Sequence, residues 1–145
     1  MPYKNIEING PVPVAQQVLQ VNQFYKGFSS INPNNLGNKL FDFDLVKQDI
    51  INQFNTKRGE RVMNPNFGSI IWDIIMEPLT PSSKEALIAD ITAICNSDQR
   101  VVPTQIDVTE YPNGYILELT LVMKKTNESS NLKLAFDAKL GLVPQ

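Results

Sequence analysis

The spacing of the apolar residues changes once along this chain of 145 residues, and the change limits the folds that the chain can adopt. Up to Cys95, apolar side chains recur every three or four positions, which places them on one face of an α-helix. From Ile106 onward they recur at every second position, which places them on one face of a β-strand. Helices that come first and strands that come last predict an α+β protein, with helices packed on a small antiparallel sheet.

The first predicted helix covers roughly residues 42–55, where apolar residues have helical spacing. Asp42 or Asp44 can accept a backbone N–H in its first turn. A charged loop, residues 57–63, follows the helix, and Gly59 within it is suited to a positive φ. The sequence therefore predicts an amphipathic helix that leads into a sharply turning loop.

The next stretch, from Phe67 to Met76, is apolar on nearly all sides and predicts a short helix at the centre of the domain. Asn64-Pro65 can begin this helix, with Pro at its first position, or the chain turns at residues 66–68 instead. Pro78 ends the helix, because a proline disfavours helical φ and ψ at the residue before it.

The third predicted helix begins with Thr80-Pro81 or, equally well, with the capping-box pair Ser82 and Glu85. Its apolar face includes Cys95, the single cysteine of the chain. One cysteine cannot form a disulfide within the chain, which fits a reducing compartment. A thiol among apolar helix residues is expected to be buried and unreactive.

The C-terminal part predicts an antiparallel meander of three strands. Turn sequences at residues 111–114 and 126–130 separate runs in which apolar and polar residues alternate. The last strand carries Leu132, Leu134 and Phe136 on one face, and we expect it at an edge because the long middle strand takes the central place. Charged residues beside these positions can guard the edge against aggregation, or a strand from another protein can add there; the pattern fits both.

Residues 1–41 form an N-terminal arm that precedes a single domain, residues 42–145. Within the arm, residues 14–25 have helical spacing, although their many valines favour a strand. This stretch carries no charged residue, and its polar residues are Gln and Asn. An uncharged segment suits a site packed against a partner, with Val18 and Val21 at the contact, or equally an ordinary surface.

Composition excludes several classes of function. The chain has no histidine, which removes Ser-His-Asp and Cys-His catalysis and most zinc sites. No glycine-rich phosphate loop is present, so we expect no cofactor and no metal. The net charge is −2, and the basic pair Lys124-Lys125 is too small for a nucleic-acid surface. No signal peptide and no apolar run near the ~20 residues of a membrane span are visible, so we expect a protein that stays in the cytoplasm or is built into something assembled there, without membrane contacts.

Carboxylates are the remaining candidates for chemistry. Glu60, Asp73 and Glu77 lie in or beside the central stretch, and a glycosidase needs two carboxyl groups at a suitable spacing. The alternative is structural: Glu60 and Arg61 form ion pairs that fix the loop, and Glu77 accepts backbone N–H groups at the start of the third helix. Trp72 offers a surface for a sugar, but its place in an apolar helix favours the core. We therefore predict no catalytic residue.

The central stretch also carries a specific order of residues. Arg58-Gly59-Glu60-Arg61 is followed by Asn64-Pro65-Asn66-Phe67-Gly68 and, after an apolar segment, by Glu77-Pro78. This order resembles the baseplate wedge subunit of contractile-tailed phages, also called the tail sheath initiator, which has relatives in type VI secretion and other contractile injection systems. The resemblance extends from the helix near Asp42 to the strands that end near Asp137. The structural residues of the shared motif are Arg58, Gly59, Glu60, Arg61, Pro65, Phe67 and Gly68.

The resemblance implies a structural protein of the virion tail baseplate, assembled in the host cytoplasm and present in several copies around a six-fold baseplate. Its sheet would imitate the strand-exchange domain of the tail sheath protein, so that the first sheath ring docks by adding its terminal arms as strands. Its helices would join a bundle with other baseplate wedge subunits, and the tail tube is a further candidate partner.

The family's Glu-Pro-Arg signature corresponds here to Glu77 and Pro78, which are expected to contact a partner. Leu79 stands where the family has Arg, so a charge contact by that Arg is in doubt. Two alternatives remain. Some family members carry a lysozyme label, which raises a peptidoglycan-cleaving muramidase, and a generic adaptor unrelated to tails is the other.

Overall fold

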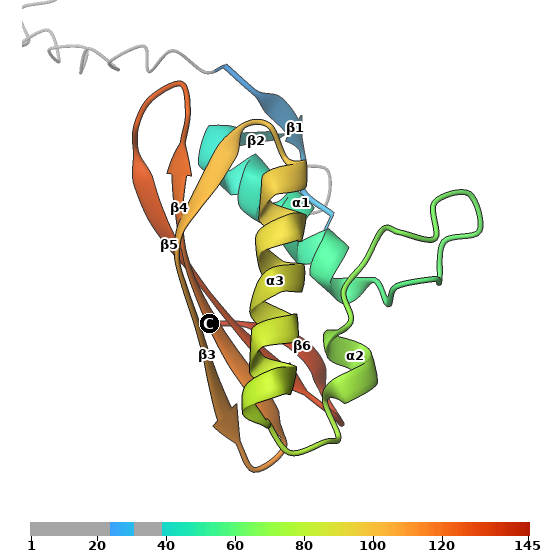
Figure 1. Ribbon diagram of the computed structural model, residues 1–145. Coiled ribbons are helices and arrows are strands. Elements are labelled where there is room, and N and C mark those ends of the chain that lie inside the picture. The colour runs from blue at the N-terminus through green and yellow to red at the C-terminus, as the bar shows by residue number, and fades with distance from the viewer. Residues whose placement is uncertain (1–23, 31–38) are drawn as a thin grey trace, which may run out of the picture.

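The computed structural model describes residues 24–30 and 39–145. A two-stranded ribbon, β1 (Lys26–Phe28) and β2 (Lys39–Phe41), precedes the helices, and the helices precede the main sheet (Figure 1). The other elements are, in chain order, α1 (Asp42–Asn55), α2 (Ile71–Ile74), α3 (Pro81–Ser97), β3 (Val101–Tyr111), β4 (Gly114–Met123), β5 (Ser129–Asp137) and β6 (Gly141–Pro144). The predicted α+β class is confirmed.

Strands β3 to β6 form one antiparallel sheet in sequence order. The sequence predicted the first three strands but missed β6, because its four residues are too few to show a period of two. β6 pairs with residues 134–137 of β5, after the chain turns back at Gly141, which has a φ of +79°. The prediction that the strand carrying Leu132, Leu134 and Phe136 lies at a sheet edge is therefore wrong for its second half.

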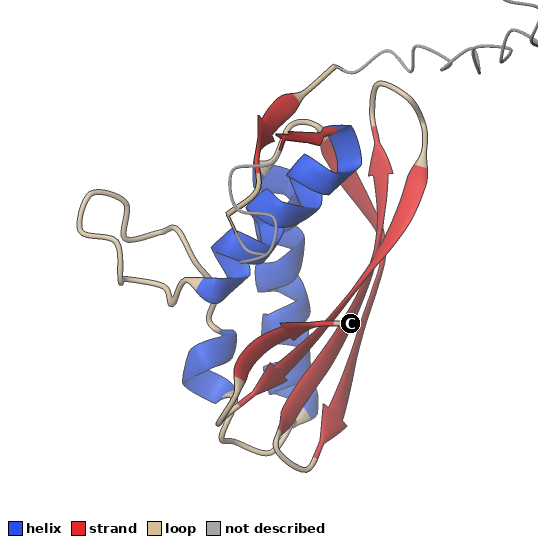
Figure 2. Cartoon of the chain, turned by 180° about the vertical axis from the view of Figure 1, so that it is seen from behind, coloured by secondary structure: helices blue, strands red, loops and turns tan. Residues whose placement is uncertain are grey.

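The helices cover one face of the sheet, with α3 lying along it, and the other face is open (Figures 1 and 2). Alternate strand residues point toward the helices, as the period of two requires. The buried apolar ones are Val101 and Val108 of β3, Tyr115, Leu117, Leu119, Leu121 and Met123 of β4, and Leu132, Leu134 and Phe136 of β5. On the open face Lys133 Nζ lies 2.7 Å from Glu118 Oε1, an exposed pair across the two central strands.

An aromatic cluster joins the helical layer to the sheet. The ring of Phe136 meets Phe54 of α1 and Trp72 of α2 edge to face, at centroid distances of 5.8 and 5.6 Å. Trp72 Nε1–H also donates to the carbonyl oxygen of Phe54 at 2.6 Å, so the polar part of the indole is satisfied. Trp72 packs against the core rather than serving as a sugar platform, in agreement with the preferred interpretation of the sequence.

The two long helices begin with different N-terminal interactions. Thr80 caps α3, because its Oγ1 accepts the N–H of Ser83 at 3.1 Å, and Pro81 takes the first helical position. Helix α1 has the predicted bounds, but neither Asp42 nor Asp44 caps it. Asp42 has a φ of +45°, and its carboxylate accepts the N–H groups of Phe24 and Tyr25, both at 2.9 Å. Asp42, one of the two predicted caps, instead ties residues 24–25 to the start of α1.

The second predicted helix is much shorter than its apolar pattern suggested. Only Ile71–Ile74 is helical, and the chain turns at residues 66–68, one of the two alternatives for this region. Gly68 explains the late start. Its φ is +114°, and Gly68 and Ser69 run beside Thr56 and Lys57 rather than as part of a helix. The apolar residues of this stretch still fill the core, with Ile71 fully buried.

The single thiol lies inside the molecule. Cys95 is fully buried on α3, and burial, with a smaller contribution from the nearby carboxylate of Asp98, raises the pKa of the thiol to about 12. A thiol with such a pKa is protonated at neutral pH, so Cys95 serves as a small apolar core residue. Among the residues that the structure describes, no helix is long and apolar enough to cross a membrane.

Candidate interaction surfaces

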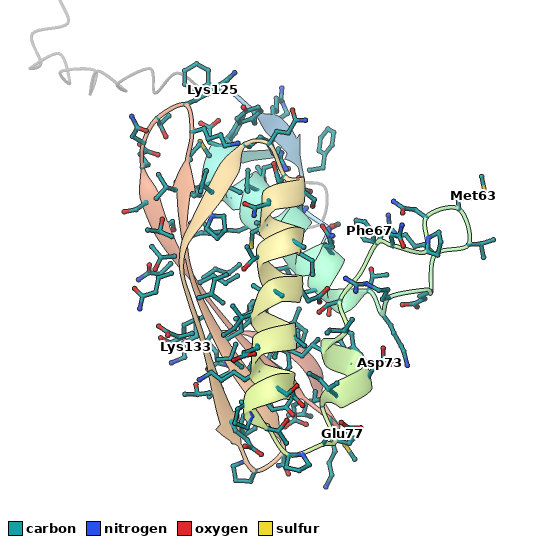
Figure 3. The ribbon with its side chains drawn as sticks, viewed as in Figure 1. Met63, Phe67, Asp73, Glu77, Lys125 and Lys133 are labelled. Atoms are coloured by element: carbon teal, nitrogen blue, oxygen red, sulfur yellow. The ribbon has the colours of Figure 1, made fainter. Side chains whose placement is uncertain are left out.

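A loop from Lys57 to Gly68, here called the projecting loop, stands out from the helical layer (Figure 3). Its base is fixed by Asp90 of α3, whose side chain is 3% exposed. One carboxylate oxygen of Asp90 pairs with the guanidinium of Arg58. The other accepts from Ser69 Oγ at 2.9 Å and from the N–H of Ile70 at 3.0 Å. One buried carboxylate therefore holds both ends of the loop.

Backbone hydrogen bonds give the projecting loop a definite shape. At the base, Arg58 N–H donates to Ser69 O at 3.3 Å, and Ser69 N–H donates to Thr56 O at 2.9 Å. Nearer the tip, Gly59 N–H donates to Pro65 O at 2.9 Å. The guanidinium of Arg61 lies 3.8 Å from the centre of the Phe67 ring, a cation–π contact on the side of the loop. The motif residues thus build a preformed loop.

The sequence predicted that Glu60 and Arg61 form ion pairs that fix the loop, and this is wrong, because neither side chain takes part in an ion pair among the described residues. Glu60 Oε2 accepts the backbone N–H of Lys57 at 3.1 Å, and Arg61 lies on an aromatic ring. The decisive ion pair is Arg58 with Asp90. Sequence reasoning missed Asp90 because a lone acidic residue within an amphipathic helix looks like a solvent-exposed one.

Replacing each of the two glycines of the projecting loop by alanine is expected to lower the free energy of unfolding by a different amount. Both have a positive φ, +87° at Gly59 and +114° at Gly68. A Cβ at Gly68 would lie 2.5 Å from Thr56 O and 2.8 Å from Lys57 C, whereas a Cβ at Gly59 meets nothing within 4 Å. We expect Gly68→Ala to lower the free energy of unfolding by about 2–3 kcal/mol, and Gly59→Ala by only about 1 kcal/mol. Urea unfolding of the two variants measures the difference, and equal losses would contradict the proposed clash.

The Glu77-Pro78 turn is held by the sheet beneath it. Tyr115 of β4 donates its hydroxyl toward the carbonyl oxygens of Ile74 at 3.0 Å and Glu77 at 2.5 Å. Burial, together with the nearby carboxylates of Glu110 and Glu77, raises the pKa of Tyr115, so the hydroxyl stays protonated and available as a donor. The predicted capping of α3 by Glu77 is wrong, because Thr80 fills that role.

A groove of about 370 Å³ lies beside this turn, between the α2–α3 connection and the β3–β4 turn. Glu77 and Pro78 line one side, and Glu110 and Tyr111 line the other. Leu79, which replaces the family's Arg, packs against the core instead. Leu79 thus supports the turn by packing against the core. Glu77 is the charged residue of the signature that lines the groove.

The carboxylates considered for catalysis do not meet as a set. Asp73 Oδ1 lies 2.6 Å from Lys57 Nζ, and Glu60 accepts the backbone N–H of the same lysine on the other side of the loop base. Glu77 lies at the far end of α2 and shares its groove with Glu110, a residue that the sequence did not single out. In the described part of the chain, no cluster of three or more Cys, Asp or Glu side chains could hold a metal ion.

The sheet offers backbone groups for pairing along β3. This strand has eleven residues and pairs only with β4, so its outer side has no neighbour among the described strands. A register shift between Pro103 and Gln105 interrupts its first part. By contrast, β5 is free of β6 only over residues 129–133. The longer unpaired edge among the described strands is therefore that of β3, whereas the sequence predicted an edge at the strand that became β5.

The residues predicted to bind a partner fall into separate groups. Leu132, Leu134 and Phe136 point into the core and are at most 7% exposed, so their side chains are not available to a partner. Glu77 and Pro78 are exposed beside the groove. Val18 and Val21 lie outside the described residues, as does most of the N-terminal arm.

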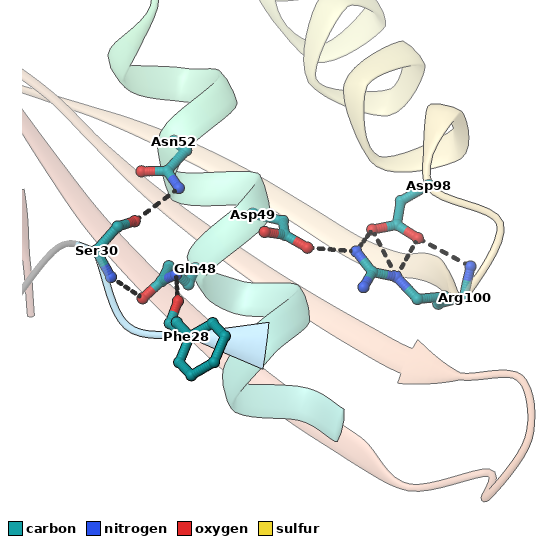
Figure 4. A network of polar contacts seen from close by, with 7 residues as sticks. All are labelled: Phe28, Ser30, Gln48, Asp49, Asn52, Asp98 and Arg100. Atoms are coloured by element: carbon teal, nitrogen blue, oxygen red, sulfur yellow. Dashed lines mark hydrogen bonds and ion pairs between the residues drawn. The ribbon is translucent and has the colours of Figure 1, made fainter. Parts of the chain in front are cut away.

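A polar network ties the first described segment to α1 (Figure 4). Gln48, 7% exposed, donates to Phe28 O at 2.8 Å and accepts from Ser30 N–H at 3.0 Å. On the other side of α1, Arg100 bridges Asp49 at 2.7 Å and Asp98 at 2.6 Å. Burial opposes ionisation of Asp98, but the hydrogen bonds and charge of Arg100 outweigh it and lower the pKa of Asp98 below its usual value. The Gln48 contacts thus hold residues 28–30 against α1, and the Arg100 contacts hold α1 against the start of β3.

Comparisons with known proteins fit this architecture. The family model described as baseplate wedge protein gp25 matches residues 42–128, which is more than half of the chain. None of the curated proteins matches. Among solved structures, the crystal structure of a candidate tail lysozyme from Geobacter sulfurreducens is similar, with a TM-score of 0.58 and 20% sequence identity, and the match covers 66% of this chain and 90% of that chain. At that identity the likeness concerns the fold.

The family match confirms the resemblance that the central stretch indicated. Its range begins at the first residue of α1 and includes the projecting loop, the Glu-Pro turn and α3, as well as β3 and β4. The partners that follow are other baseplate proteins, and the location is the tail of the virion. The chain belongs to the baseplate wedge protein gp25 family and is a structural component of a contractile-tail baseplate.

Proposed function

We propose that this baseplate component starts polymerisation of the tail sheath by accepting a terminal arm of a sheath subunit as an additional strand. The observation that carries the proposal is the outer edge of β3, which is long and unpaired among the described strands. An extended segment that adds to such an edge gains backbone hydrogen bonds without requiring a preformed pocket. The same backbone pairing then serves every copy around the baseplate.

The register supports a specific set of receiving positions on β3. Tyr111 and Gly114 flank a two-residue turn, which makes them a hydrogen-bonded pair of the hairpin. Alternate residues of β3 therefore turn their N–H and C=O groups away from β4, and these are Ile106, Val108 and Glu110. The bulge at Pro103 protects the beginning of the strand. Strand addition is accordingly confined to the segment after the bulge.

A proline at Ile106 tests the proposal, because it removes one outward N–H in the middle of the receiving segment and places a ring against the incoming strand. Ile106→Ala is the matched control, since it loses the same side chain but keeps the N–H. We expect baseplates with Ile106→Pro to contain the chain and to carry tail tubes without sheath. Baseplates with the alanine variant should carry sheath.

Electron microscopy of negatively stained tails measures sheath, and immunoblotting of purified baseplates measures incorporation of the chain. Sheath of normal length on Ile106→Pro baseplates would show that the outer edge of β3 does not receive the sheath arm. Circular dichroism of the free variants confirms that both remain folded before the assembly result is interpreted.

A further inference from the structure

The tip of the projecting loop presents two neighbouring apolar side chains to water. Val62 is 93% exposed and Met63 is 96% exposed, more than any other large apolar residue in the described part of the chain. Figure 3 shows Met63 at the point of the loop farthest from the helices. Adjacent apolar side chains at such a position are unfavourable in water and gain free energy when another surface covers them.

The loop keeps these side chains extended instead of folding them onto its own protein. Asp90 fixes the base through Arg58 and Ser69, and the hydrogen bond from Gly59 N–H to Pro65 O closes the loop below the tip. A further bond, from Asn64 N–H to Arg61 O at 3.3 Å, shapes the tip itself. Such a tip loses little conformational entropy on binding, which favours a role in recognition.

Polar residues surround the apolar pair. Glu60 and Arg61 precede it, and Asn64 and Asn66 follow it, all of them exposed. An apolar centre with a polar rim is the usual arrangement of a protein–protein contact. The matching surface is an apolar pocket whose rim carries hydrogen-bonding groups. Methionine, being unbranched and flexible, adapts to the shape of such a pocket.

The position of the loop separates it from the strand edge. It projects from the helical layer, whereas β3 lies on the opposite side of the molecule, and the two views agree on this (Figures 1 and 2). A strand paired with the outer edge of β3 therefore lies away from the tip, which leaves the tip accessible to a different partner.

Three grooves in the described part of the chain carry charged side chains, and the one beside the projecting loop is lined by Asp49, Arg61 and Asp98. The groove beside Glu77 also carries Glu110. A second groove, on the open face of the sheet, is lined by charged residues that include Asp107 and Lys133. These carboxylates and the amine would be desolvated opposite an apolar tip, which is costly. A second copy of the chain is therefore a poor acceptor.

We propose that the projecting loop is a plug, in which Val62 and Met63 insert into an apolar, polar-rimmed pocket of a neighbouring baseplate wedge subunit of different sequence. The proposal rests on the family membership of the chain and not on the sheath docking proposed above. It assigns the two contacts of the protein to opposite sides, with wedge attachment at the loop and sheath attachment at β3.

The test uses the full chain, co-expressed with the other wedge subunits of the same baseplate. Val62→Ser combined with Met63→Ser removes the apolar tip, and Leu140→Ser, at a residue that is 78% exposed in the β5–β6 turn, is the control. We expect the double variant to melt at the same temperature as the unmodified chain. We expect its affinity for the purified wedge complex to fall about a hundredfold, while the control binds normally.

A photo-reactive benzophenone side chain at position 63 provides a second measurement in assembled baseplates. Cross-linking to a wedge subunit supports the plug. Normal wedge affinity of the double variant, or cross-linking to sheath, to a second copy of this chain or to nothing, overturns it. The readouts also separate the two proposals: failure of sheath docking leaves wedge affinity unchanged, and failure of the plug leaves sheath growth on existing baseplates unchanged.

Discussion

Replacing Asp90 with alanine is expected to lower the free energy of unfolding by about 3–4 kcal/mol and to detach the projecting loop from α3. The carboxylate is 3% exposed and accepts from Arg58, from Ser69 Oγ and from Ile70 N–H. Without it, the hydroxyl of Ser69, a fully buried residue, has lost its acceptor. Arg58, 41% exposed on its side chain, can turn to water, which limits the cost of the broken pair.

The matched control for Asp90→Ala is Asp73→Ala, which removes the same group from another ion pair at the base of the loop. Asp73 and Lys57 are about half exposed, and such pairs contribute less than about 1 kcal/mol. Thermal unfolding should therefore separate the two variants by roughly 10 °C. If both melted together, Asp90 would not be the anchor of the loop. Loss of hydrogen-exchange protection at Ser69 and Ile70 in Asp90→Ala alone would locate the effect.

Phe136→Ala is expected to cost about 3–5 kcal/mol, because it opens a cavity where α1, α2 and the sheet meet. Phe136 is fully buried and makes edge-to-face contacts with both Phe54 and Trp72. The control is Phe28→Ala, which removes the same group from a residue that is 64% exposed and should change the free energy of unfolding by less than about 0.5 kcal/mol. Urea unfolding of the free chains measures both.

The outcome also decides the role of Phe136. The sequence placed it on an edge strand at a partner contact, whereas the structure places its side chain in the core. A free Phe136→Ala chain as stable as the unmodified one would contradict the core role. The expected destabilisation would mean that any assembly defect of this variant reflects folding and not a lost contact.

The sequence predicted those elements whose pattern repeats over several turns or pairs. The bounds of α1 and the strands on either side of Gly114 followed from local residues alone, and the cap of α3 at Thr80 is one of the two starts that the sequence allowed. The apolar stretch after Phe67 was misjudged in length, because hydrophobicity indicates burial but not the backbone path. There Gly68, with its positive φ, delays the helix. The strand β6 was missed because its four residues are too few to show an alternating pattern.

The candidate surfaces depended on contacts between distant parts of the chain, which no local pattern records. Asp90 lies 32 residues from Arg58 in sequence, and Tyr115 lies 38 residues from Glu77, yet these pairs fix the loop and the Glu-Pro turn. The position of the open sheet edge depended on the unpredicted β6. The order of the motif residues, by contrast, can be read from the sequence alone. This order indicated the family that the comparison confirmed.

The closure of the projecting loop by Asp90 has a mechanical consequence. Because both ends of the loop are bonded to Asp90, tension applied at Met63 is shared between the backbone, which leads into α1 and α2, and α3 with the sheet that it covers. If the tip is attached to a wedge subunit as proposed above, load applied there enters the protein at its helical layer and not at the β3 edge. Breaking the Arg58–Asp90 pair would then loosen the projecting loop from α3 without requiring any strand of the sheet to separate.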